Sequence, residues 1–513
     1  MIRTLVDAGV DVCFTNPGTS EMHFVAALDS VPEMRAVLGL FEGVVTGAAD
    51  GYARMAGKPA ATLLHLGPGL GNGLANLHNA RRGRTPVVNI VGDHATYHLE
   101  YDAPLTSDIA AAARNVSSWI RRPETAAELC DATADAVAAA MGPPGQVATL
   151  ILPADASWSD GATPVAPREL VTRRSVDADV LDRVAKVLVS GEPCALLIGG
   201  SAMREAGLRA AARISAATGA KLLGETFPAR LERGAGLPPI ERLGYLSEFM
   251  EIQLSGMRHL VIVDTGPPVG FFAYPGKASY LVPDGCEVHV VVDPSDGLDA
   301  VGALEQLADV VAAGVDPVVQ SLARPERPTG AVNGETVAAA LGALLPEGAI
   351  VCDEANTSGL WASGATAGSP RHDWLTLTGG AIGVGMPLAT GAAVACPDRP
   401  VINLEADGSA MYTMQALWTQ AREGLDVTTI VFNNRSYAIL NMELGRTGAG
   451  AGGPKAKSMF DLSNPDLDFV SLSRGMGVPA ERATDAAELT VALEKALAEP
   501  GPHLIEAILP TVL

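Results

Sequence analysis

The sequence has few basic residues and no clustered cysteines. Its 513 residues include 58 acidic but 36 basic side chains, which gives a formal net charge of −22. Such a chain repels phosphate backbones and anionic lipids, so we expect no nucleic-acid partner and no binding to a membrane surface. The six cysteines are scattered without a Cys-x-x-Cys pair, which argues against a disulfide scaffold and a thiolate zinc site. They predict reduced thiols in a cytoplasmic protein.

A membrane-spanning run and a secretory leader are also lacking. The longest uncharged stretch, residues 378–396, consists largely of Gly, Ala and Thr and carries Pro387 near its middle. This composition does not suit a membrane span and predicts a buried, tightly packed helix. The sequence does not open with a charged segment followed by an apolar one, so we predict no signal peptide.

The hydrophobic pattern predicts an α/β protein. Apolar runs of strand length alternate with Ala-rich segments of helical period, and the runs are continuous, as in parallel strands covered on both faces. A chain of 513 residues also exceeds what one core supports. Segments rich in Pro, Gly and Ser interrupt the rhythm near 153–170 and 321–335. We therefore predict three domains, at residues 1–160, 175–322 and 333–513, each an open parallel sheet flanked by helices.

The first and third predicted domains share an internal likeness. Residues 58–67, KPAATLLHLG, and residues 399–408, RPVINLEADG, both contain a basic residue, a proline, an apolar strand and a glycine turn. This alignment makes His65 and Ala406 equivalent strand ends. If the likeness reflects a duplication, the two domains would pair about a pseudo-twofold axis with their strand ends facing one cleft, where ligands of open α/β sheets gather.

The segment around Asp407 predicts a site for a metal ion and an anion. An apolar strand leads into Asp407-Gly408-Ser409, a helix is predicted over 410–423, and the next strand runs into Asn434. A right-handed crossover between parallel strands would place Asp407 and Asn434 at the same sheet edge. A carboxylate, an amide oxygen and a backbone carbonyl suit Mg²⁺ or Ca²⁺, and the free N–H groups of a helix start suit a phosphate. Taken alone, Asp407 is more commonly a helix cap and the Asn pair a turn.

In combination, these fragments resemble the thiamine-diphosphate motif, which begins with Gly-Asp-Gly and ends with a double Asn. Ala406 stands in place of the first glycine. The segments NPGTSE, FEGVVTGAADGYA, LHLGPGLGNGLANL and GGAIGVGMPLATGAA are similar to the benzoylformate decarboxylase and acetolactate synthase branch of thiamine-diphosphate enzymes. The resemblance covers nearly the whole chain. It implies an aminopyrimidine-binding (Pyr) domain, a central domain and a diphosphate-binding (PP) domain.

The resemblance implies a cofactor site assembled from the outer domains. The implied ligands of Mg²⁺ (or Ca²⁺) are Asp407, Asn434 and the carbonyl of Ser436. Further implied cofactor contacts are Asn356, Thr357, Gly380, Ile382, Gly408, Ser409, Tyr437 and Ala438. Of these, Ile382 would wedge the cofactor into its V shape, and the carbonyl of Gly380 would bind its 4′ nitrogen. Glu42 would contact N1′ of the aminopyrimidine and favour the imino tautomer that removes the C2 proton. In this family the sites form between subunits, so we expect a homodimer or homotetramer.

On the substrate side, the resemblance points to two histidines and a threonine. His65 matches a histidine that handles protons on the substrate-derived intermediate, and Thr19 matches a serine that binds the substrate carboxylate. The second active-site histidine of the decarboxylase falls at Ala273, which carries no proton. His94 lies in a loop that faces the cofactor in relatives and would substitute as a proton donor, although His94 and His98 are also consistent with surface histidines. A purely structural role is likewise the alternative for His65.

The resemblance implies non-oxidative decarboxylation of a small 2-oxo acid with thiamine diphosphate and Mg²⁺. Because Ala273 cannot donate a proton, we expect carboligation of the acetolactate synthase kind, with simple aldehyde release of the benzoylformate decarboxylase kind as the alternative. The middle-domain segment LLIGGSAMREAGLRAAARI cradles FAD in flavin-binding members, so FAD is compatible with it but not implied by it. A catalytically weak paralogue and a flavin-dependent oxidase are less favoured hypotheses.

Overall fold

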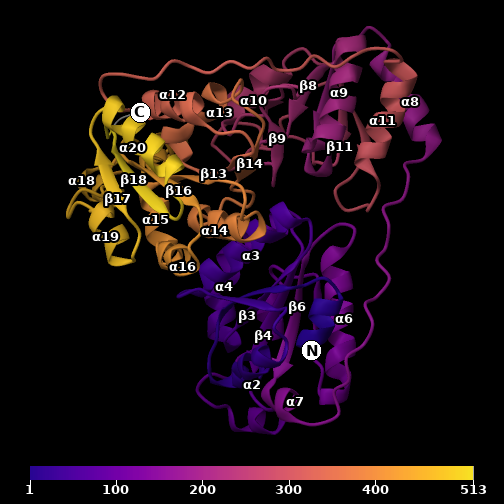
Figure 1. The fold of residues 1–513 in the computed structure, drawn as a ribbon. Coiled ribbons are helices and arrows are strands. Elements are labelled where there is room, and N and C mark those ends of the chain that lie inside the picture. Colours follow the sequence, from indigo (N-terminus) through magenta and orange to yellow (C-terminus); the bar gives the residue numbers. More distant parts are fainter. Residues whose placement is uncertain (512–513) are drawn as a thin grey trace.

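The computed structural model describes residues 1–511 and contains three α/β regions, each built on its own sheet (Figure 1). The N-terminal region forms one end of the molecule, and the middle and C-terminal regions lie together at the other end (Figure 1). Extended connections at 159–177 and 312–333 join successive regions. The predicted α/β class is confirmed, whereas the predicted domain limits stay predictions.

The N-terminal sheet is parallel and has the strand order β2-β1-β3-β4-β6-β5. Its strands are β1 Val12–Asn16, β2 Arg35–Leu38, β3 Ala60–Leu64, β4 Val87–Asp93, β5 Trp119–Arg121 and β6 Val147–Pro153. Its helices are α1 Ile2–Asp7, α2 Met22–Ala27, α3 Glu42–Ala56, α4 Leu66–Arg82, α5 Ile109–Ala113, α6 Ala126–Met141 and α7 Ala154–Trp158, with 3-10 turns η1 Thr19–Glu21, η2 Leu28–Ser30 and η3 Thr96–Tyr101. Strands β4 and β6 are buried along their whole length, as their largely apolar sequences predict.

The middle sheet is also parallel, with the order β10-β8-β7-β11-β12. Its strands are β7 Cys194–Ile198, β8 Lys221–Gly224, β10 Glu241–Arg242, β11 His259–Val263 and β12 Glu287–Val292. Its helices are α8 Ala178–Leu188, α9 Glu205–Thr218, α10 Ser247–Leu254 and α11 Ala300–Val311, with the 3-10 turn η4 Gly200–Met203.

The C-terminal sheet has the order β17-β18-β16-β15-β13-β14-β9. Its own strands are parallel: β13 Ile350–Glu354, β14 His372–Thr376, β15 Val401–Ala406, β16 Val427–Asn433, β17 Ala480–Ala483 and β18 His503–Ile508. The short strand β9, Leu231–Arg233, comes from the middle region and pairs antiparallel with β14 at the sheet edge. The helices are α12 Gly334–Leu344, α13 Ala362–Ala365, α14 Gly385–Ala395, α15 Asp407–Thr413, α16 Ala416–Glu423, α17 Ala438–Arg446, α18 Pro454–Ser458, α19 Phe469–Gly475 and α20 Ala486–Ala498, with the 3-10 turn η5 Asn356–Gly359.

The two outer sheets share one topology. Counted from the first strand of each sheet, both have the order 2-1-3-4-6-5, and β9 is an addition to the second. Strands β3 and β15 are therefore equivalent third strands, and His65 and Ala406 lie at equivalent strand ends. The internal likeness seen in the sequence is confirmed at the level of topology.

The outer regions are joined by two helices, α3 and α14, that cross at glycines. A Cβ on Gly391 would lie 1.8 Å from the carbonyl oxygen of Ala48, and one on Gly51 would lie 2.0 Å from that of Leu388. Only glycine allows backbones to approach this closely. The expected tight packing of the Gly/Ala-rich segment is confirmed for α14.

Two predicted helices differ in extent from those observed. Helix α14 takes up only the second half of residues 378–396, because Gly380 and Gly383 adopt φ values of +74° and +91° and keep the first half in a loop. The helix predicted over 410–423 begins at Asp407 instead and is split into α15 and α16.

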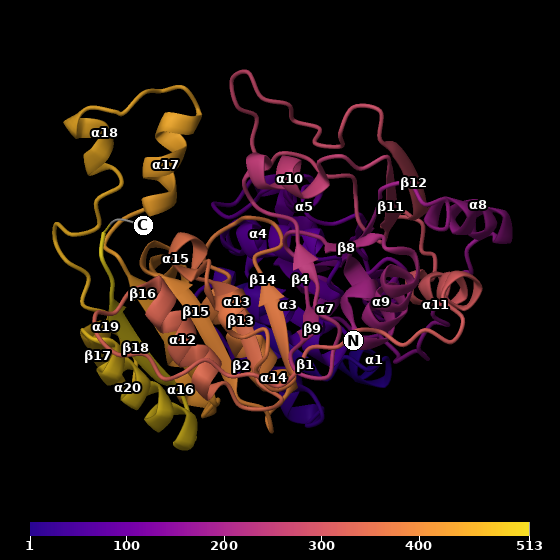
Figure 2. The same ribbon diagram turned by 90° about the horizontal axis from the view of Figure 1, so that it is seen from above.

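Figure 2 shows α17 and α18 standing out from the C-terminal sheet on the side of α10. Arg446 of α17 forms two hydrogen bonds of 3.0 Å each with the Glu248 carboxylate of α10, which ties this arm to the middle region. Among residues 1–511, the structure has no helix that combines the length and the apolar character of a membrane span.

Candidate active site

The carboxyl edge of the C-terminal sheet brings Asp407 and Asn434 together. Strands β15 and β16 are parallel neighbours in which Ala406 pairs with Phe432. Asp407 and Asn434, which follow the two strands, therefore lie close together. Asp407 Oδ1 accepts a hydrogen bond of 2.8 Å from the amide of Gly408, and its Oδ2 accepts one of 2.6 Å from the amide of Arg435. The proximity predicted from the crossover is confirmed.

The Asp407 carboxylate is buried, and the two amides do not neutralise its charge. Burial raises the pKa of Asp407 to about 6, although hydrogen bonds from backbone amides act in the opposite direction. The Arg435 side chain turns away and hydrogen-bonds the carbonyl of Leu509. A buried carboxylate in such an oxygen-rich turn suits a divalent cation, which would restore the charge balance.

Asn434 and Ser436 complete this turn. The Oδ1 of Asn434 accepts a 2.9 Å hydrogen bond from the Ser436 amide, and its Nδ2 donates to Ser358 Oγ at 3.1 Å. Both residues are buried. Asp407 therefore meets the turn that carries Asn434 and Ser436, and the three expected oxygen donors form a set that suits a hard cation such as Mg²⁺.

The expected diphosphate contacts surround the same edge. Asn356 Nδ2 donates to Ser409 Oγ at 3.1 Å, which links the end of β13 to the start of α15. A Cβ on Gly408 would lie 2.2 Å from the ring of Tyr437, so the ring needs a glycine there. Thr357 lies in η5 beside Asn356, and Ala438 opens α17 directly after Tyr437. Ala406 has φ −77° and ψ 144°, an extended conformation that its methyl group does not strain.

A buried carboxylate that the sequence did not single out shapes the loop of Gly380 and Ile382. Glu354 ends β13 and accepts hydrogen bonds from the amides of Gly383 and Gly385. Burial raises the pKa of Glu354, and burial together with Glu354 raises the pKa of the adjacent Glu405. Glu354 belongs to the sequence DEANTSG, but its partners lie about thirty residues away along the chain.

Glu42 is the first residue of α3, and its carboxylate is buried, not turned to solvent. Asn72 of α4 donates a hydrogen bond of 2.9 Å to Glu42 Oε2. Gly69 of the same helix passes close by, since a Cβ there would lie 3.3 Å from Oε1. The N-terminal region thus fixes the carboxylate that the cofactor resemblance requires.

His65 is held by a second buried glutamate that the sequence did not single out. His65 follows β3, and its Nδ1 lies 2.8 Å from Oε2 of Glu21, which also accepts from the Gly18 amide. Glu21 is fully buried, and burial raises its pKa. Gly18 is required for this contact because a Cβ there would lie 2.2 Å from the imidazole. Glu21 is the last residue of the segment NPGTSE, and this segment was the sequence signal that could have identified it.

The remaining predicted residues of the N-terminal edge lie at the ends of neighbouring strands. Thr19 is exposed in η1, next to Gly18. His94 follows β4, the neighbour of β3, and its Nε2 is buried without a hydrogen-bond partner among the described residues. The His94 and His98 rings are 5.2 Å apart. This edge therefore gathers His65, His94 and Thr19, and their roles stay predictions.

The middle region contributes an aromatic loop to the site. Phe271 packs against Phe227 and Tyr245, and a Cβ on Gly380 would lie 2.6 Å from the Phe271 ring. Ala273, two residues further on, is exposed. An apolar aromatic surface thus borders the loop that carries Gly380 and Ile382.

The carboxyl edge of the middle sheet does not fit a flavin dinucleotide. The amide of Gly200 donates to Glu225 Oε1 at 2.8 Å, and the amide of Ser201 donates to Asp264 Oδ2 at 2.8 Å. Arg84 of the N-terminal region forms an ion pair with Asp264. The amides that would receive a phosphate are already bound to carboxylates, so this edge does not offer them to FAD.

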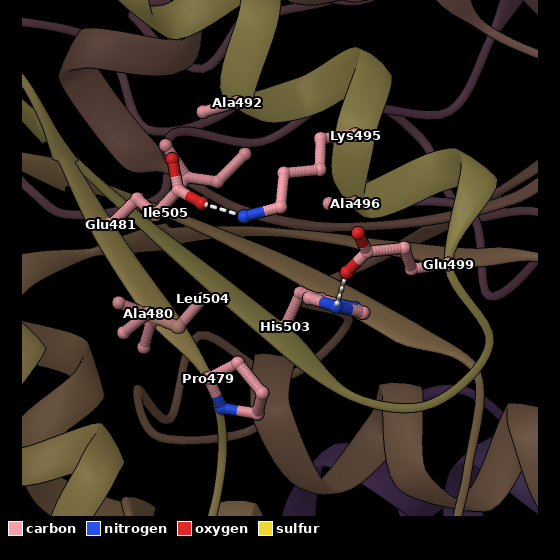
Figure 3. A pocket seen from close by; sticks show the side chains of 10 residues that line it. All are labelled: Pro479, Ala480, Glu481, Ala492, Lys495, Ala496, Glu499, His503, Leu504 and Ile505. Atoms are coloured by element: carbon pink, nitrogen blue, oxygen red, sulfur yellow. Dashed lines mark hydrogen bonds and ion pairs between the residues drawn. The ribbon is translucent and has the colours of Figure 1, made fainter.

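A pocket between α20 and strands β17 and β18 lies elsewhere (Figure 3). His503, the first residue of β18, lines this pocket. The pocket therefore lies at the amino edge of the sheet, opposite the carboxyl edge that carries Asn434. Its volume of about 40 Å³ is far below the roughly 300–1,000 Å³ of ligand pockets. The carboxyl edges of the outer sheets are the candidate site.

Comparisons with known proteins agree with this geometry. The family described as "Thiamine pyrophosphate enzyme, N-terminal TPP binding domain" matches residues 1–113, and its C-terminal TPP binding domain matches residues 355–507. The chain is 60% identical, over 100% of its length and 99% of the relative, to a Mycobacterium tuberculosis protein named "Putative acetolactate synthase large subunit IlvX". It is 30% identical to "Benzoylformate decarboxylase" of Pseudomonas aeruginosa, over 98% of this chain and 97% of the relative.

Solved structures give the same result. The structure titled "Rhodococcus jostii RHA1 thiamine diphosphate-dependent 4-hydroxybenzoylformate decarboxylase" superposes with a TM-score of 0.85 at 25% identity, covering 99% of this chain and 98% of that one. Full-length coverage at this similarity, with both cofactor-binding domains matched, establishes the family. The chain belongs to the thiamine-diphosphate-dependent enzymes.

Proposed function

We propose that the protein decarboxylates a small 2-oxo acid with thiamine diphosphate and Mg²⁺ and joins the remaining fragment to a second carbonyl compound. The observation that carries the proposal is the buried Asp407 carboxylate beside Asn434, at a sheet edge whose topological counterpart carries His65. One edge supplies metal and phosphate ligands, and the other supplies proton-transferring groups.

Each group would have a distinct task. When bound, thiamine diphosphate supplies a carbon nucleophile and a sink for the electrons left as CO₂ departs. Asp407, Asn434 and the Ser436 carbonyl would hold the metal. Glu42 would hold a proton at N1′ of the aminopyrimidine, and His65 would transfer a proton at the substrate oxygen.

Glu21 would act on the reaction through His65. Its hydrogen bond to Nδ1 fixes the orientation of the imidazole, which leaves Nε2 for the substrate. A base oriented by a buried carboxylate is a recurring arrangement in general acid–base catalysis. Thr19, exposed beside Gly18, would hydrogen-bond the carboxylate of the 2-oxo acid.

Two observations favour carboligation. The relative with 60% identity carries the name of an acetolactate synthase subunit. Ala273 also offers no proton at the position where the decarboxylase resemblance expects a histidine. A fragment that is not protonated quickly persists long enough to add to a second carbonyl compound.

Aldehyde release is the second candidate, and the His65–Glu21 contact favours it. A histidine held at 2.8 Å by a carboxylate is equipped to deliver a proton, and His94 follows the neighbouring strand. The relative with 30% identity is named a benzoylformate decarboxylase. A flavin oxidase is disfavoured because Glu225 and Asp264 occupy the middle-sheet amides, and a binding-only paralogue because Glu42 is retained.

Product analysis separates the two candidates. The protein with thiamine diphosphate and Mg²⁺ is incubated with pyruvate, 2-oxobutyrate and benzoylformate, each alone and in pairs. We expect CO₂ release with acetolactate or a related hydroxyketo acid as the main product. Free aldehyde as the main product would establish the alternative, and no CO₂ release from any of a wide panel of 2-oxo acids would contradict both.

We further propose that each site forms between two chains of a homodimer or homotetramer. Exposed apolar side chains flank both halves: Leu40 near Glu42, and Met411 and Tyr412 just after Asp407. A partner chain would cover them.

Complementation tests the shared site. Glu42→Gln and Asp407→Asn chains, each inactive alone, are coexpressed with different tags and the mixed oligomer is purified. Mixed oligomers contain one wild-type site if the halves come from different chains, so activity should return to a substantial fraction of the wild-type value. No recovery in a verified mixed oligomer would show that one chain supplies both halves.

We also propose a cytoplasmic location. All six cysteines are free thiols, and four of them, Cys13, Cys130, Cys194 and Cys352, are buried. Reduced thiols are typical of the cytoplasm. Fractionation of cells that produce the native protein, with a periplasmic marker as control, checks this proposal.

A further inference from the structure

The middle sheet carries a cluster of histidine and glutamate at its amino edge, away from the candidate active site. His259 and Glu287 are the first residues of the parallel neighbours β11 and β12, and they pair with each other in register. His289 follows two residues later on β12, which is the edge strand of this sheet (β11 and β12 are labelled in Figure 2). Gly200 and Asp264 lie at the opposite, carboxyl edge of the same sheet.

Three potential metal ligands converge in this cluster. His259 Nδ1 lies 3.1 Å from His289 Nε2. The Oε2 of Glu287 lies 3.7 Å from His259 Nδ1 and 3.9 Å from His289 Nε2. Two nitrogens bound to one tetrahedral Zn²⁺ at about 2.0–2.1 Å are separated by roughly 3.3 Å. The imidazoles already have this spacing, and Glu287, whose side chain is 73% exposed, is free to move the few tenths of an ångström needed.

A fourth residue orients the first histidine. Glu192 Oε2 lies 2.8 Å from His259 Nε2, on the far side of the ring from His289. This contact places the imidazole proton on Nε2 and leaves a lone pair on Nδ1, directed at the cluster. A carboxylate behind a ligating histidine is a common feature of zinc sites.

His289 is accessible to a metal ion from solvent. It lines an open groove between α8 and β12, which gives an ion and its water ligands a route to the cluster.

We propose that His259, His289 and Glu287 bind a Zn²⁺-type ion, with water completing the coordination and Glu192 positioning His259. Two imidazoles and one carboxylate are the ligands that zinc accepts, whereas the oxygen donors around Asp407 suit Mg²⁺. The ion would pin the edge strand β12 to β11. It would therefore be a structural ion, separate from the metal of the active site.

Zinc titration of matched variants tests the proposal. The holoenzyme, kept in excess Mg²⁺ and thiamine diphosphate, is treated with a chelator column, dialysed against buffered Zn²⁺ and measured for bound zinc by mass spectrometry. We expect wild type to bind one more Zn²⁺ per chain than His289→Gln or Glu287→Gln. Glu192→Gln should weaken zinc binding about 10- to 100-fold.

His503→Gln is the control variant. His503 begins a strand of another sheet, and its Nε2 lies 3.4 Å from Oε2 of Glu499 (Figure 3). It therefore has a histidine–carboxylate contact like that of His259 and Glu192, but no cluster of further ligands among the described residues. This variant should bind as much zinc as wild type. Glu287 is exposed, so its variant keeps the fold even if a histidine variant does not. Equal zinc content in wild type and Glu287→Gln, with Co²⁺ giving the same visible absorption in both, would overturn the proposal and leave a hydrogen-bonded histidine pair.

Discussion

The tetrapeptide Gly-Ser-Ala-Met occurs twice in this chain, at residues 200–203 and 408–411. In both places it begins two residues after the last residue of a parallel strand, β7 in the middle sheet and β15 in the C-terminal sheet. The first copy donates its Gly200 and Ser201 amides to carboxylates of its own region. The second copy lies in the first turn of α15, and its Ser409 hydroxyl accepts a hydrogen bond from Asn356.

The difference between the two copies arises from the neighbouring strands. Glu225 follows β8 and Asp264 follows β11, so acidic groups close the first edge. Asn434 follows β16, and Asn356 lies just beyond β13, so amide groups border the second. The same local sequence therefore forms a closed edge in one sheet and a candidate cofactor edge in the other. A motif of this kind identifies a site only together with the residues that end the adjacent strands.

Replacing Asp407, the acidic residue directly before the second copy, should have the largest effect. Asp407→Asn removes the charge that balances the divalent cation, so Mg²⁺-dependent binding of thiamine diphosphate should weaken at least about 100-fold, with loss of turnover. Calorimetric titration of the cofactor in the presence of Mg²⁺ measures this. The comparison variant beside the first copy, Asp264→Asn, removes the carboxylate that accepts from Ser201 and should bind the cofactor as wild type does. Equal cofactor loss in both variants would remove the distinction between the two edges.

A protein without the Glu42 carboxylate should still bind the cofactor at the Asp407 edge but should turn over much more slowly. Glu42→Gln keeps the shape and the contact with Asn72 yet loses the proton acceptor, so turnover should fall about 10²- to 10⁴-fold while cofactor affinity changes only severalfold. Steady-state kinetics with the best 2-oxo acid checks this. Glu33→Gln, an exposed glutamate paired with Arg3 on the same domain, serves as the control and should leave both quantities unchanged.

The positioning residue Glu21 should have a smaller effect. Glu21→Gln leaves His65 in place but removes the carboxylate that orients it, so kcat/KM should fall about tenfold with unchanged cofactor affinity. Burial raises the pKa of Glu21, so wild type should lose activity as pH falls through that raised pKa, and the variant should lack this acid limb. Identical pH profiles for the two proteins would show that Glu21 is only structural.

The smallest effect is expected for Glu225, which accepts a hydrogen bond from the first copy, and it concerns stability. Burial raises the pKa of Glu225 from its ordinary value of 4.5 to about 7. The unfolded chain then releases this proton at lower pH than the folded chain, so stability is lost as pH rises through about 7. Glu225→Gln keeps the acceptor for the Gly200 amide and should raise the free energy of unfolding by about 3 kcal/mol at pH 8. Thermal melts at pH 8 and pH 4 check this, since the difference should vanish at pH 4.

Much of this arrangement could be predicted from the sequence. Unbroken apolar runs located the long strands, and the crossover between β15 and β16 brought Asp407 and Asn434 together as expected. The alignment of His65 with Ala406 anticipated the shared strand order of the outer sheets. These features follow from local periodicity and from the handedness of parallel connections, which a sequence reports directly.

The features that were missed depend on contacts that are distant in sequence. Glu21 meets His65, and Glu354 meets the Gly383 loop, only after the strands have assembled. The Gly-rich start of residues 378–396 has a helical composition, but positive φ angles keep it in a loop. Strand β9 has only three residues and no hydrophobic alternation, so its pairing with the C-terminal sheet had no local signal.

The central claim is that Glu42 activates a cofactor held at the Asp407 edge. Its most direct test is the rate at which deuterium replaces the C2 proton of bound thiamine diphosphate, followed by quenched-flow NMR with Mg²⁺ at cofactor saturation. Wild type should exchange this proton at least about 100-fold faster than Glu42→Gln, with both proteins fully loaded. Equal exchange rates in the two loaded proteins would contradict the account.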